Sequence, residues 1–289
     1  MSSTTARRAT TTTARPPSTA PLPSVPSLAL TRAGLELRQF WRERDAVIFV
    51  FAYPIVMLAI FATVFGAEEQ GGPVASVDYA QYFLPGMVAT GIMLTSFQSL
   101  AVSIAVERDD GTLRRLRGTP LPVTSYFGGK VLLTLATSVV QTAVLLAVAA
   151  WLYDVPMPDD VSRWATFAWV YVLGTATGAV CGVAFSSVPR SGRSASAVVT
   201  PVVLILQFVS GVFFAFFALP GWMQTAASVF PLKWLAQGMR SVFLPEDMVV
   251  LETGGSWQLG AVAAVLGAWL ILCLVIGVRT FRWRRRDDG

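Results

Sequence analysis

The charged segment 107–122 has the residue types and spacing that best suit a specific role. It reads Glu-Arg-Asp-Asp-Gly-Thr-Leu-Arg-Arg-Leu-Arg-Gly-Thr-Pro-Leu-Pro. Gly111 and Pro120 bracket a stretch that can form about two helical turns. Leu113 and Leu116 share one face of such a helix, so they could anchor it in a groove on a soluble partner while the charges fix its register. On spacing alone, the simpler interpretation is a solvated basic connector.

Few other residues suit catalysis or ligand binding. The chain has no histidine, which excludes His-based acid–base catalysis, Ser–His or Cys–His nucleophiles and His-ligated metals. Cys181 and Cys273 lack metal-ligand spacing and a basic neighbour, so we interpret both as small apolar side chains. Lys130 ends a Gly-Gly-Lys sequence, but Thr124 and Val131 stand where a phosphate-binding loop needs Gly and Ser or Thr. We predict no metal site, no cofactor bound by this chain and no ATP hydrolysis by it.

The elements that must position the charged segment are membrane helices. Of the 289 residues, 54% are hydrophobic and only 13% are charged, whereas about 25% of residues are charged in soluble domains. Every Asp, Glu, Lys and Arg lies outside six stretches, each long enough to cross a bilayer core. These stretches are 46–67, 79–106, 131–153, 164–189, 194–232 and 253–278. We predict an all-α polytopic membrane protein with six transmembrane helices.

The distribution of Lys and Arg predicts the orientation of these helices. With both termini in the cytoplasm, 7 precede the first stretch, 5 lie between the second and third, 2 lie between the fourth and fifth, and 5 follow the sixth. Only Arg163, Lys233 and Arg240 then lie outside. Because Lys and Arg are enriched in cytoplasmic loops, the net charge of +5 reflects topology rather than nucleic-acid binding. We expect a multi-pass protein of the cell (plasma) membrane with both termini cytoplasmic.

The N-terminal residues divide into two parts. Residues 1–27 hold 12 Ser or Thr, 5 Pro and 3 Arg without an apolar run, which predicts a disordered cytoplasmic tail rather than a signal peptide. Residues 28–45 form an amphipathic helix, which lies in the membrane interface or packs on the cytoplasmic ends of the bundle. Its apolar side includes Leu30, Leu37 and Trp41, and its polar side includes Arg32 and Glu36. Residues 46–280 then form the six-helix domain, and residues 281–289 form a basic cytoplasmic tail.

Uncharged polar side chains lie within the predicted spans, but no charged residue lies near the centre of a span. The missing charge disfavours a proton- or ion-coupled carrier. Gln98, Gln207, Ser210, Phe213 and Phe214 form a candidate substrate pathway, weakly polar and suited to an amphipathic solute. The simpler alternatives are hydrogen bonds between helices for the polar residues and interface packing for the aromatic ones.

Two local patterns concern packing. Glycine recurs every four residues at Gly174, Gly178 and Gly182, which predicts a close contact with another helix. We favour a helix of the same subunit over a helix of a second subunit. The fifth charge-free stretch, 194–232, has 39 residues and is too long for one straight span. Its prolines can break the helix. We expect the fifth helix at 195–218, followed by apolar re-entrant or interfacial helices at 219–245.

Three segments together resemble the ATP-binding cassette type-2 permease family. They are Glu107-Arg108 … Gly111-Thr112-Leu113 … Leu116 … Thr119-Pro120-Leu121, then Tyr82-Phe83-Leu84-Pro85-Gly86, and Ser210-Gly211 … Leu219-Pro220-Gly221-Trp222 … Phe230-Pro231-Leu232 … Arg240. The likeness spans residues 30–280, and the order of the segments on six spans is specific. One departure is Arg114, where many members carry an acidic residue, so the family pattern does not fix which charges on a partner match this loop.

The resemblance implies a role in transport. In such permeases two copies or two related subunits form the channel, and a separate ATPase subunit, which uses ATP and Mg, docks on the loop between helices 2 and 3 and on the N-terminal helix. By resemblance, the coupling element here comprises Glu107, Arg108, Gly111, Thr112, Leu113, Leu116, Thr119 and Pro120. Family members include daunorubicin/doxorubicin-resistance permeases and polysaccharide and lipid exporters.

We therefore expect the permease subunit of an ATP-driven exporter of a drug, antibiotic or other amphipathic natural product. One alternative is a lipid or polysaccharide export permease of the same family. Another is a six-span membrane enzyme or assembly factor, which the lack of histidine and metal-ligand clusters disfavours.

Overall fold

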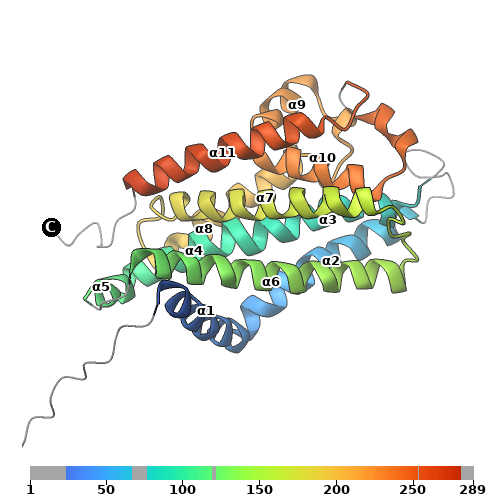
Figure 1. The fold of residues 1–289 in the computed structure, drawn as a ribbon. Helices are drawn as coiled ribbons and strands as arrows, with labels where there is room; N and C mark the ends of the chain where they lie inside the picture. Colours follow the sequence, from blue (N-terminus) through green and yellow to red (C-terminus); the bar gives the residue numbers. More distant parts are fainter. Residues whose placement is uncertain (1–23, 67–76, 119–121, 253, 281–289) are drawn as a thin grey trace, which may run out of the picture.

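Helices make up the described fold. The computed structural model describes residues 24–66, 77–118, 122–252 and 254–280, and these ranges contain no β-strand (Figure 1). In chain order the elements are α1 (Val25–Arg42), α2 (Arg44–Gly66), α3 (Tyr79–Met93), η1 (Leu94–Gln98), α4 (Ser99–Asp109), α5 (Thr112–Arg117), α6 (Val123–Leu152), α7 (Val161–Phe185), α8 (Gly192–Val209), η2 (Phe216–Ala218), α9 (Gly221–Ser228), α10 (Pro231–Phe243), η3 (Glu246–Leu251) and α11 (Leu259–Thr280).

Six segments are long and apolar enough to cross a membrane. They are Val47–Phe65, Tyr79–Asp109, Thr124–Leu152, Val161–Phe185, Gly192–Val209 and Leu259–Thr280. Each one overlaps a charge-free stretch of the sequence, because an apolar run of this length has few stable alternatives to a membrane helix. The prediction of an all-α protein with six membrane-spanning helices is confirmed.

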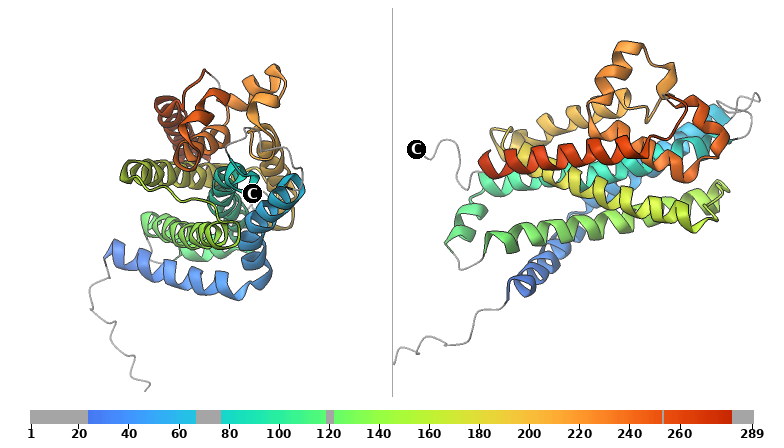
Figure 2. Two further views of the ribbon diagram at one scale, coloured as in Figure 1. Left: turned by 90° about the vertical axis from the view of Figure 1, so that its right-hand side faces the viewer. Right: turned by 45° about the horizontal axis from the view of Figure 1, so that its top comes forward.

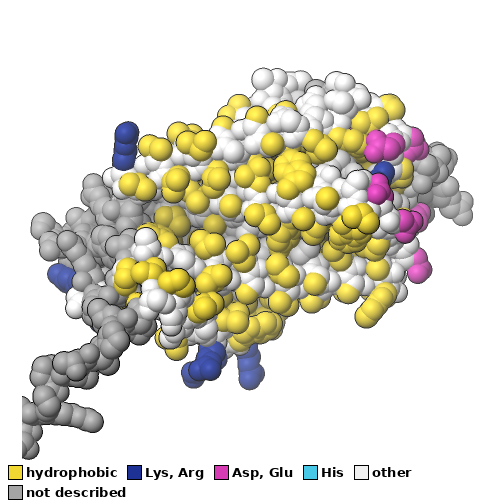
Figure 3. Space-filling model, viewed as in Figure 1, with side chains coloured by type: hydrophobic (Ala, Val, Ile, Leu, Met, Phe, Trp, Pro, Cys, Tyr) yellow, Lys and Arg dark blue, Asp and Glu magenta, His cyan; other side chains and the backbone are white. Residues whose placement is uncertain are grey.

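The bundle has two distinct ends. One carries α5 and the turn between α7 and α8, and is called the α5 end; the opposite end carries η3 and the connection from α6 to α7 (Figure 1). Figure 3 shows hydrophobic side chains over the middle of the visible face, acidic side chains at the opposite end, and basic side chains mainly toward the α5 end. Lipid tails are as apolar as these side chains, so such a belt is stable in a bilayer.

α3 occupies the centre of the bundle. Its residues from Phe83 to Met93 are all buried. Gly86 permits a close neighbour, because a Cβ added there would lie 3.1 Å from the carbonyl oxygen of Val212. α3 continues through the π-helical η1 into α4, where the Ser99 hydroxyl donates to the carbonyl of Leu94 at 3.0 Å. π-helical turns widen a helix locally and are frequent at functional sites.

The glycine pattern of α7 packs inside this chain. A Cβ added to Gly182 would lie 2.6 Å from the carbonyl oxygen of Phe97, and one added to Gly178 would collide with the Ser96 hydroxyl. A Cβ on Gly174 would collide with Leu235 of α10. The glycines therefore let α7 contact η1 and α10 closely, as predicted for a contact within the subunit.

The fifth span is shorter than predicted. α8 ends at Val209, whereas the sequence pattern predicted a helix over 195–218. Gly211 adopts a φ of +73°, which favours glycine, and a Cβ there would lie 2.8 Å from the Cβ of Phe216. This turn ends the helix nine residues before its predicted end. The predicted helices between the fifth and sixth spans are present as α9 and α10, and α10 is buried from Leu232 to Phe243.

The charged residues of α10 are buried with partners. The Arg240 guanidinium pairs with the Glu252 carboxylate, with Nη2 and Oε2 3.3 Å apart, and its Nη1 donates to the Gly211 carbonyl at 3.5 Å. The Lys233 ammonium donates to Gln237 Oε1. Burial lowers the pKa of Lys233 to about 8, with a smaller lowering by Arg240 and an opposing contribution from Glu252.

α1 lies crosswise to the spans (Figure 2). It covers Val25–Arg42, so it begins and ends three residues before the predicted helix 28–45, and residues 25–27 belong to it rather than to the predicted tail. Residues 1–23 and 281–289, which hold the rest of the predicted tails, lie outside the described residues. A crosswise amphipathic helix suits the membrane interface, and that position in the membrane stays a prediction.

Candidate functional site

The predicted coupling segment forms a tight turn followed by the short helix α5. Gly111 precedes α5 and has a φ of +79°, so a side chain at this position would be strained. The Asp110 carboxylate accepts a hydrogen bond from the backbone N–H of Thr112 at 2.8 Å. Sequence and turn geometry therefore agree that position 111 requires glycine. Thr119 and Pro120, also assigned to the segment, lie outside the described residues.

Leu113 belongs to the core of this chain. Its side chain is fully buried in a cluster with residues of α4, α6 and α7, and Leu116 packs half-buried against the same cluster. A side chain that its own subunit buries cannot also fill a groove on another protein. The prediction that Leu113 anchors a docking partner is therefore wrong. The exposed surface of α5 is basic instead, with Arg114 and Arg115 outward.

Glu107 lies at the centre of an ionic cluster that joins three helices. Its Oε1 is 2.7 Å from Lys130 Nζ and 3.5 Å from Arg32 Nη2, while its Oε2 accepts a hydrogen bond from the Tyr126 hydroxyl at 2.7 Å. Glu36 completes the cluster, 3.2 Å from Lys130 Nζ and 2.6 Å from Arg32 Nε. Two cations and two anions make the cluster neutral, as buried charges require. It binds α1, α4 and α6 together at the α5 end of the bundle.

The sequence of α6 makes room for α1. A Cβ added to Gly129 would lie 2.7 Å from Cγ of Arg32, and one added to Gly128 would lie 3.2 Å from Cβ of Ala29. The Gly-Gly-Lys sequence is therefore a contact surface for α1. Its Lys130 is buried in the ionic cluster, with 4% of its side chain exposed.

The side of α1 that faces the protein carries both polar and apolar residues. Arg32 and Glu36 point toward α6, whereas Leu30 is 64% exposed and Trp41 is 49% exposed. Gln39, Arg42 and Glu43 of the predicted polar side are exposed, so the amphipathic pattern does not coincide with the side that packs on the bundle. Lys130 and Glu107 provide the opposite charges that make the inward positions of Glu36 and Arg32 favourable.

Arg108 and Asp109 bind the α5 region to the turn between α7 and α8. Arg108 Nη2 donates to the carbonyl oxygen of Pro189 at 2.8 Å. Asp109 Oδ2 accepts a hydrogen bond from the backbone N–H of Gly192, at the start of α8, at 3.1 Å. A displacement of this region therefore acts on α8 as well as on α1 and α6.

A cavity of about 430 Å³ opens at the ionic cluster, and all four charged residues of the cluster line it. Gln98 lines it, and its Oε1 has no hydrogen-bond partner among the described residues. Hydroxyl side chains from η1, α4 and α6 also line it: Thr95, Ser99, Ser103, Thr134 and Thr137. Apolar walls come from Phe40, Val50 and Leu133, among others. A cavity with polar and apolar walls and this volume suits a small amphipathic molecule.

The other predicted pathway residues lie elsewhere. Gln207 is buried, and its Oε1 accepts a hydrogen bond from the Tyr53 hydroxyl at 2.8 Å. Ser210 is also fully buried at the end of α8. Phe213 is only 4% exposed and belongs to the main core, whereas Phe214 is 48% exposed. The structure therefore brings Gln207, Ser210 and Phe213 into one region but separates them from the cavity at Gln98.

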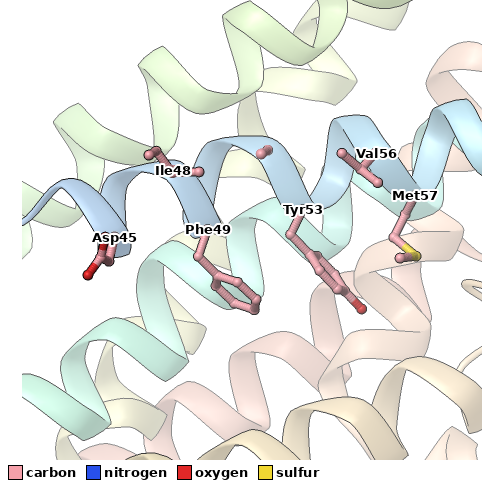
Figure 4. Close-up of a pocket in the computed structure, with 7 residues that line it drawn as sticks. Asp45, Ile48, Phe49, Tyr53, Val56 and Met57 are labelled. Atoms are coloured by element: carbon pink, nitrogen blue, oxygen red, sulfur yellow. The ribbon is translucent and has the colours of Figure 1, made fainter.

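A second hollow, of about 420 Å³, follows one side of α2. Phe49, Tyr53 and Met57 point to the same side of the helix, as Figure 4 shows. The hollow borders the α8 region through the hydrogen bond from Tyr53 to Gln207. Of the predicted pathway residues, only Gln98 lines one of these two hollows, and Gln207 reaches the second only through Tyr53.

Sequence reasoning missed the partners of Glu107. Arg32 and Glu107 are 75 residues apart, so local spacing could not pair them. Lys130 gave a weak signal. It is a lone cation at the start of a long apolar stretch, and a buried cation needs a counter-ion. The sequence could not predict the hydrogen bonds of Arg108 and Asp109, because their partners are backbone atoms, which every residue carries. In the part of the chain that the structure describes, no group of His, Cys, Asp and Glu gathers as metal ligands.

Six helices able to span a membrane, a buried helix between the fifth and sixth of them, and a charged turn joined to α1 define a multi-pass membrane protein. The chain belongs to the ABC-2 type transporter family, which matches residues 30–244. It is 23% identical over 234 residues to the "Inner membrane transport permease YadH" of Escherichia coli (strain K12), covering 78% of this chain and 88% of that one. It is 23% identical over 276 residues to the "Daunorubicin resistance ABC transporter permease protein DrrB1" of Streptomyces coeruleorubidus, covering 87% of each.

A third relative is named "Probable multidrug ABC transporter permease YbhR", from Escherichia coli (strain K12). It is 23% identical over 198 residues, which are 67% of this chain. The match covers 52% of that relative, so the chain spans about half of its length. Relatives of this kind are permease subunits and are not enzymes themselves.

Proposed function

We propose that this chain is the permease subunit of an ATP-driven exporter of a drug, antibiotic or other amphipathic natural product. Membership of the ABC-2 type transporter family supports a transport role, and the names of DrrB1 and YbhR favour drugs among the substrates. The cavity at Gln98 supports the same class, because its walls combine charged, hydroxyl and amide groups with apolar side chains. Export of a lipid or polysaccharide is the second candidate.

The α5 end is assigned to the cytoplasm, and the protein to the cell membrane. With this orientation Lys and Arg number 19 on the cytoplasmic side and 3 outside, as cytoplasmic loops require. Both termini are then cytoplasmic. ATP and Mg are bound by a separate soluble ATPase subunit, and the channel is completed by a second copy of this chain or by a related permease.

One observation carries the proposed mechanism: Glu107 joins the segment before α5 to α1 and α6 through buried ion pairs. An ATPase that contacts the basic face of α5 and the exposed side of α1 would move these elements together. The hydrogen bonds of Arg108 and Asp109 pass the same displacement to the start of α8. Because the cavity at Gln98 lies between the moving elements, its access changes when the ATPase closes.

The first observation is whether the neighbouring reading frame encodes a soluble phosphate-loop ATPase, and the test produces the chain together with that ATPase. Inside-out membrane vesicles from these cells should accumulate daunorubicin when ATP is added and not when a non-hydrolysable ATP analogue is added. The ATPase should co-purify with the chain. The Glu107→Gln variant should lose most uptake, while Asp159→Asn, at an exposed position outside the cavity, removes one carboxylate charge and serves as the control.

The outcomes separate the candidates. ATP-dependent uptake of a fluorescent lipid but not of daunorubicin would replace the drug assignment with the second candidate. Absence of ATPase co-purification together with absence of ATP-dependent movement of either probe would overturn the exporter assignment.

A further inference from the structure

The two cysteines of the chain meet inside the bundle. Cys181 of α7 and Cys273 of α11 are 92 residues apart in sequence, yet their Sγ atoms lie 3.0 Å apart. Both side chains are buried, with 8% and 5% of their surface exposed. Sequence reasoning treated them as unrelated apolar side chains, since nothing in their spacing indicates a contact. A disulfide bond of about 2.05 Å requires the two sulfur atoms to approach by only about 1 Å.

The packing of α7 on α11 holds this geometry in place. One side of the pair is fixed by the Thr177 hydroxyl, which donates to the carbonyl oxygen of Leu266 at 3.1 Å. On the other side, a Cβ added to Gly277 would lie 3.9 Å from the Cβ of Ala184. The cysteines therefore occupy the middle of a continuous, tightly packed seam. Neither helix can rotate one thiol away without disturbing the contacts on both sides.

We propose that Cys181 and Cys273 are a dithiol pair that closes to an intramembrane disulfide when it meets a lipid-soluble oxidant such as a quinone. The two S–H bonds break and one S–S bond forms. The two electrons and two protons reduce the quinone to a quinol. The pair lies near the α5 end of α7, since Cys181 is followed by only four residues of that helix, so an oxidant in the adjacent leaflet can reach it. The product links the fourth and sixth spans covalently.

The chain suits a direct test because it has only two cysteines. Membranes that contain the full-length protein are treated with copper(II) phenanthroline. Two copper(II) complexes accept one electron each, and the two thiol protons pass to water. The protein is then unfolded in SDS and labelled with a maleimide reagent that adds visible mass. Oxidised wild-type protein should bind no maleimide, migrate as a monomer, and regain two labels after dithiothreitol treatment. Cys181→Ser and Cys273→Ser should each keep one label.

Two engineered pairs provide matched controls. In a Cys181→Ser/Cys273→Ser background, Ala184→Cys/Gly277→Cys is the positive control, because its 3.9 Å Cβ separation is typical of disulfides. The negative control is Cys273→Ser/Leu274→Cys in the wild-type chain, which retains Cys181 and moves its partner to position 274. Leu274 is 53% exposed and points away from the seam. This variant should keep both labels under the same treatment.

Three outcomes would overturn the proposal. One is retention of both labels by the wild-type protein while the positive control loses both. Another is loss of label through linkage of two chains, visible as a band at twice the monomer mass. The third is equal loss of label in the Leu274→Cys control, which would show random collision between mobile helices rather than a built pair.

Discussion

Removal of one charge from the ionic cluster is the sharpest test of how the α5 end is held together. Glu107→Gln preserves the shape of the side chain but leaves Arg32 and Lys130 facing Glu36 alone. Breaking a buried ion pair in this way costs about 3–5 kcal/mol. Because 17% of the Glu107 side chain is exposed, water screens part of the uncompensated charge. We expect a loss of about 2–4 kcal/mol, which corresponds to a melting temperature lower by roughly 5–10 °C.

A second substitution distinguishes the charge effect from a loss of packing. Lys130→Met alone leaves two carboxylates facing Arg32, so it should cost about as much as Glu107→Gln. The double variant again has one cation and one anion, Arg32 and Glu36, which stay paired at 2.6 Å. Its loss should therefore be smaller than the sum of the single losses by at least about 1.5 kcal/mol.

The assay is thermal unfolding of each purified variant in detergent, followed by tryptophan fluorescence at fixed lipid and salt concentrations. Glu43→Gln is the control, since Glu43 is exposed and accepts only a hydrogen bond from Gln39 at 3.2 Å. It should change the free energy of unfolding by less than about 0.5 kcal/mol. Additive losses in the double variant, or a Glu107→Gln variant as stable as this control, would refute the cluster as a buried electrostatic unit.

Four further results are expected. Leu113→Ala should lower the free energy of unfolding by about 2–5 kcal/mol because the side chain is fully buried, and Leu116→Ala should cost clearly less; equal losses in thermal unfolding would contradict their different burial. Stability should rise between about pH 8 and 10.5, because the unfolded chain holds a proton on Lys233 that the folded chain has released; the pH series with Lys233→Met should lose this rise. In a cysteine-free background, Asp159→Cys should react with an impermeant thiol reagent added to intact cells and Gly118→Cys should not; the reverse pattern would invert the proposed orientation. Finally, the purified chain should hydrolyse no ATP, and turnover that a substitution in this chain abolishes would contradict that expectation.

Hydropathy predicted the spans well because a charge-free run of this length has few stable states outside a membrane. The end of α8 could not be predicted in the same way. The residues after Val209 are as apolar as those before it, so composition does not mark the change. The helix ends because Gly211 adopts a positive φ and receives Phe216 against its bare Cα. That arrangement depends on the packing of a later segment, which hydropathy does not describe.

The sequence located the short helix of the predicted coupling segment, but not the orientation of its side chains. Leu113 was expected on an outward face, since a short basic helix between two spans resembles a docking element. Its burial depends on α4 and α6, which flank α5 in the sequence, and on the distant α7, and the sequence does not show that the three helices enclose this side chain. The same limit applies to α1. In a membrane both lipid and protein core accept apolar side chains, so an amphipathic pattern cannot tell which side faces inward.

The contacts at the α5 end also suggest an order of events under the proposed function. α5 follows directly from the last turn of Tyr79–Asp109, the central span of the bundle. This span is interrupted midway by the π-helical η1, whose last residue, Gln98, lines the cavity. A displacement of α5 would first move α4, which is held to α1 and α6 through Glu107. Because η1 lacks the regular hydrogen bonding of an α-helix, it is the natural place for the span to bend. We therefore expect the cavity at Gln98 to change shape before α3, which is buried on all sides, begins to move.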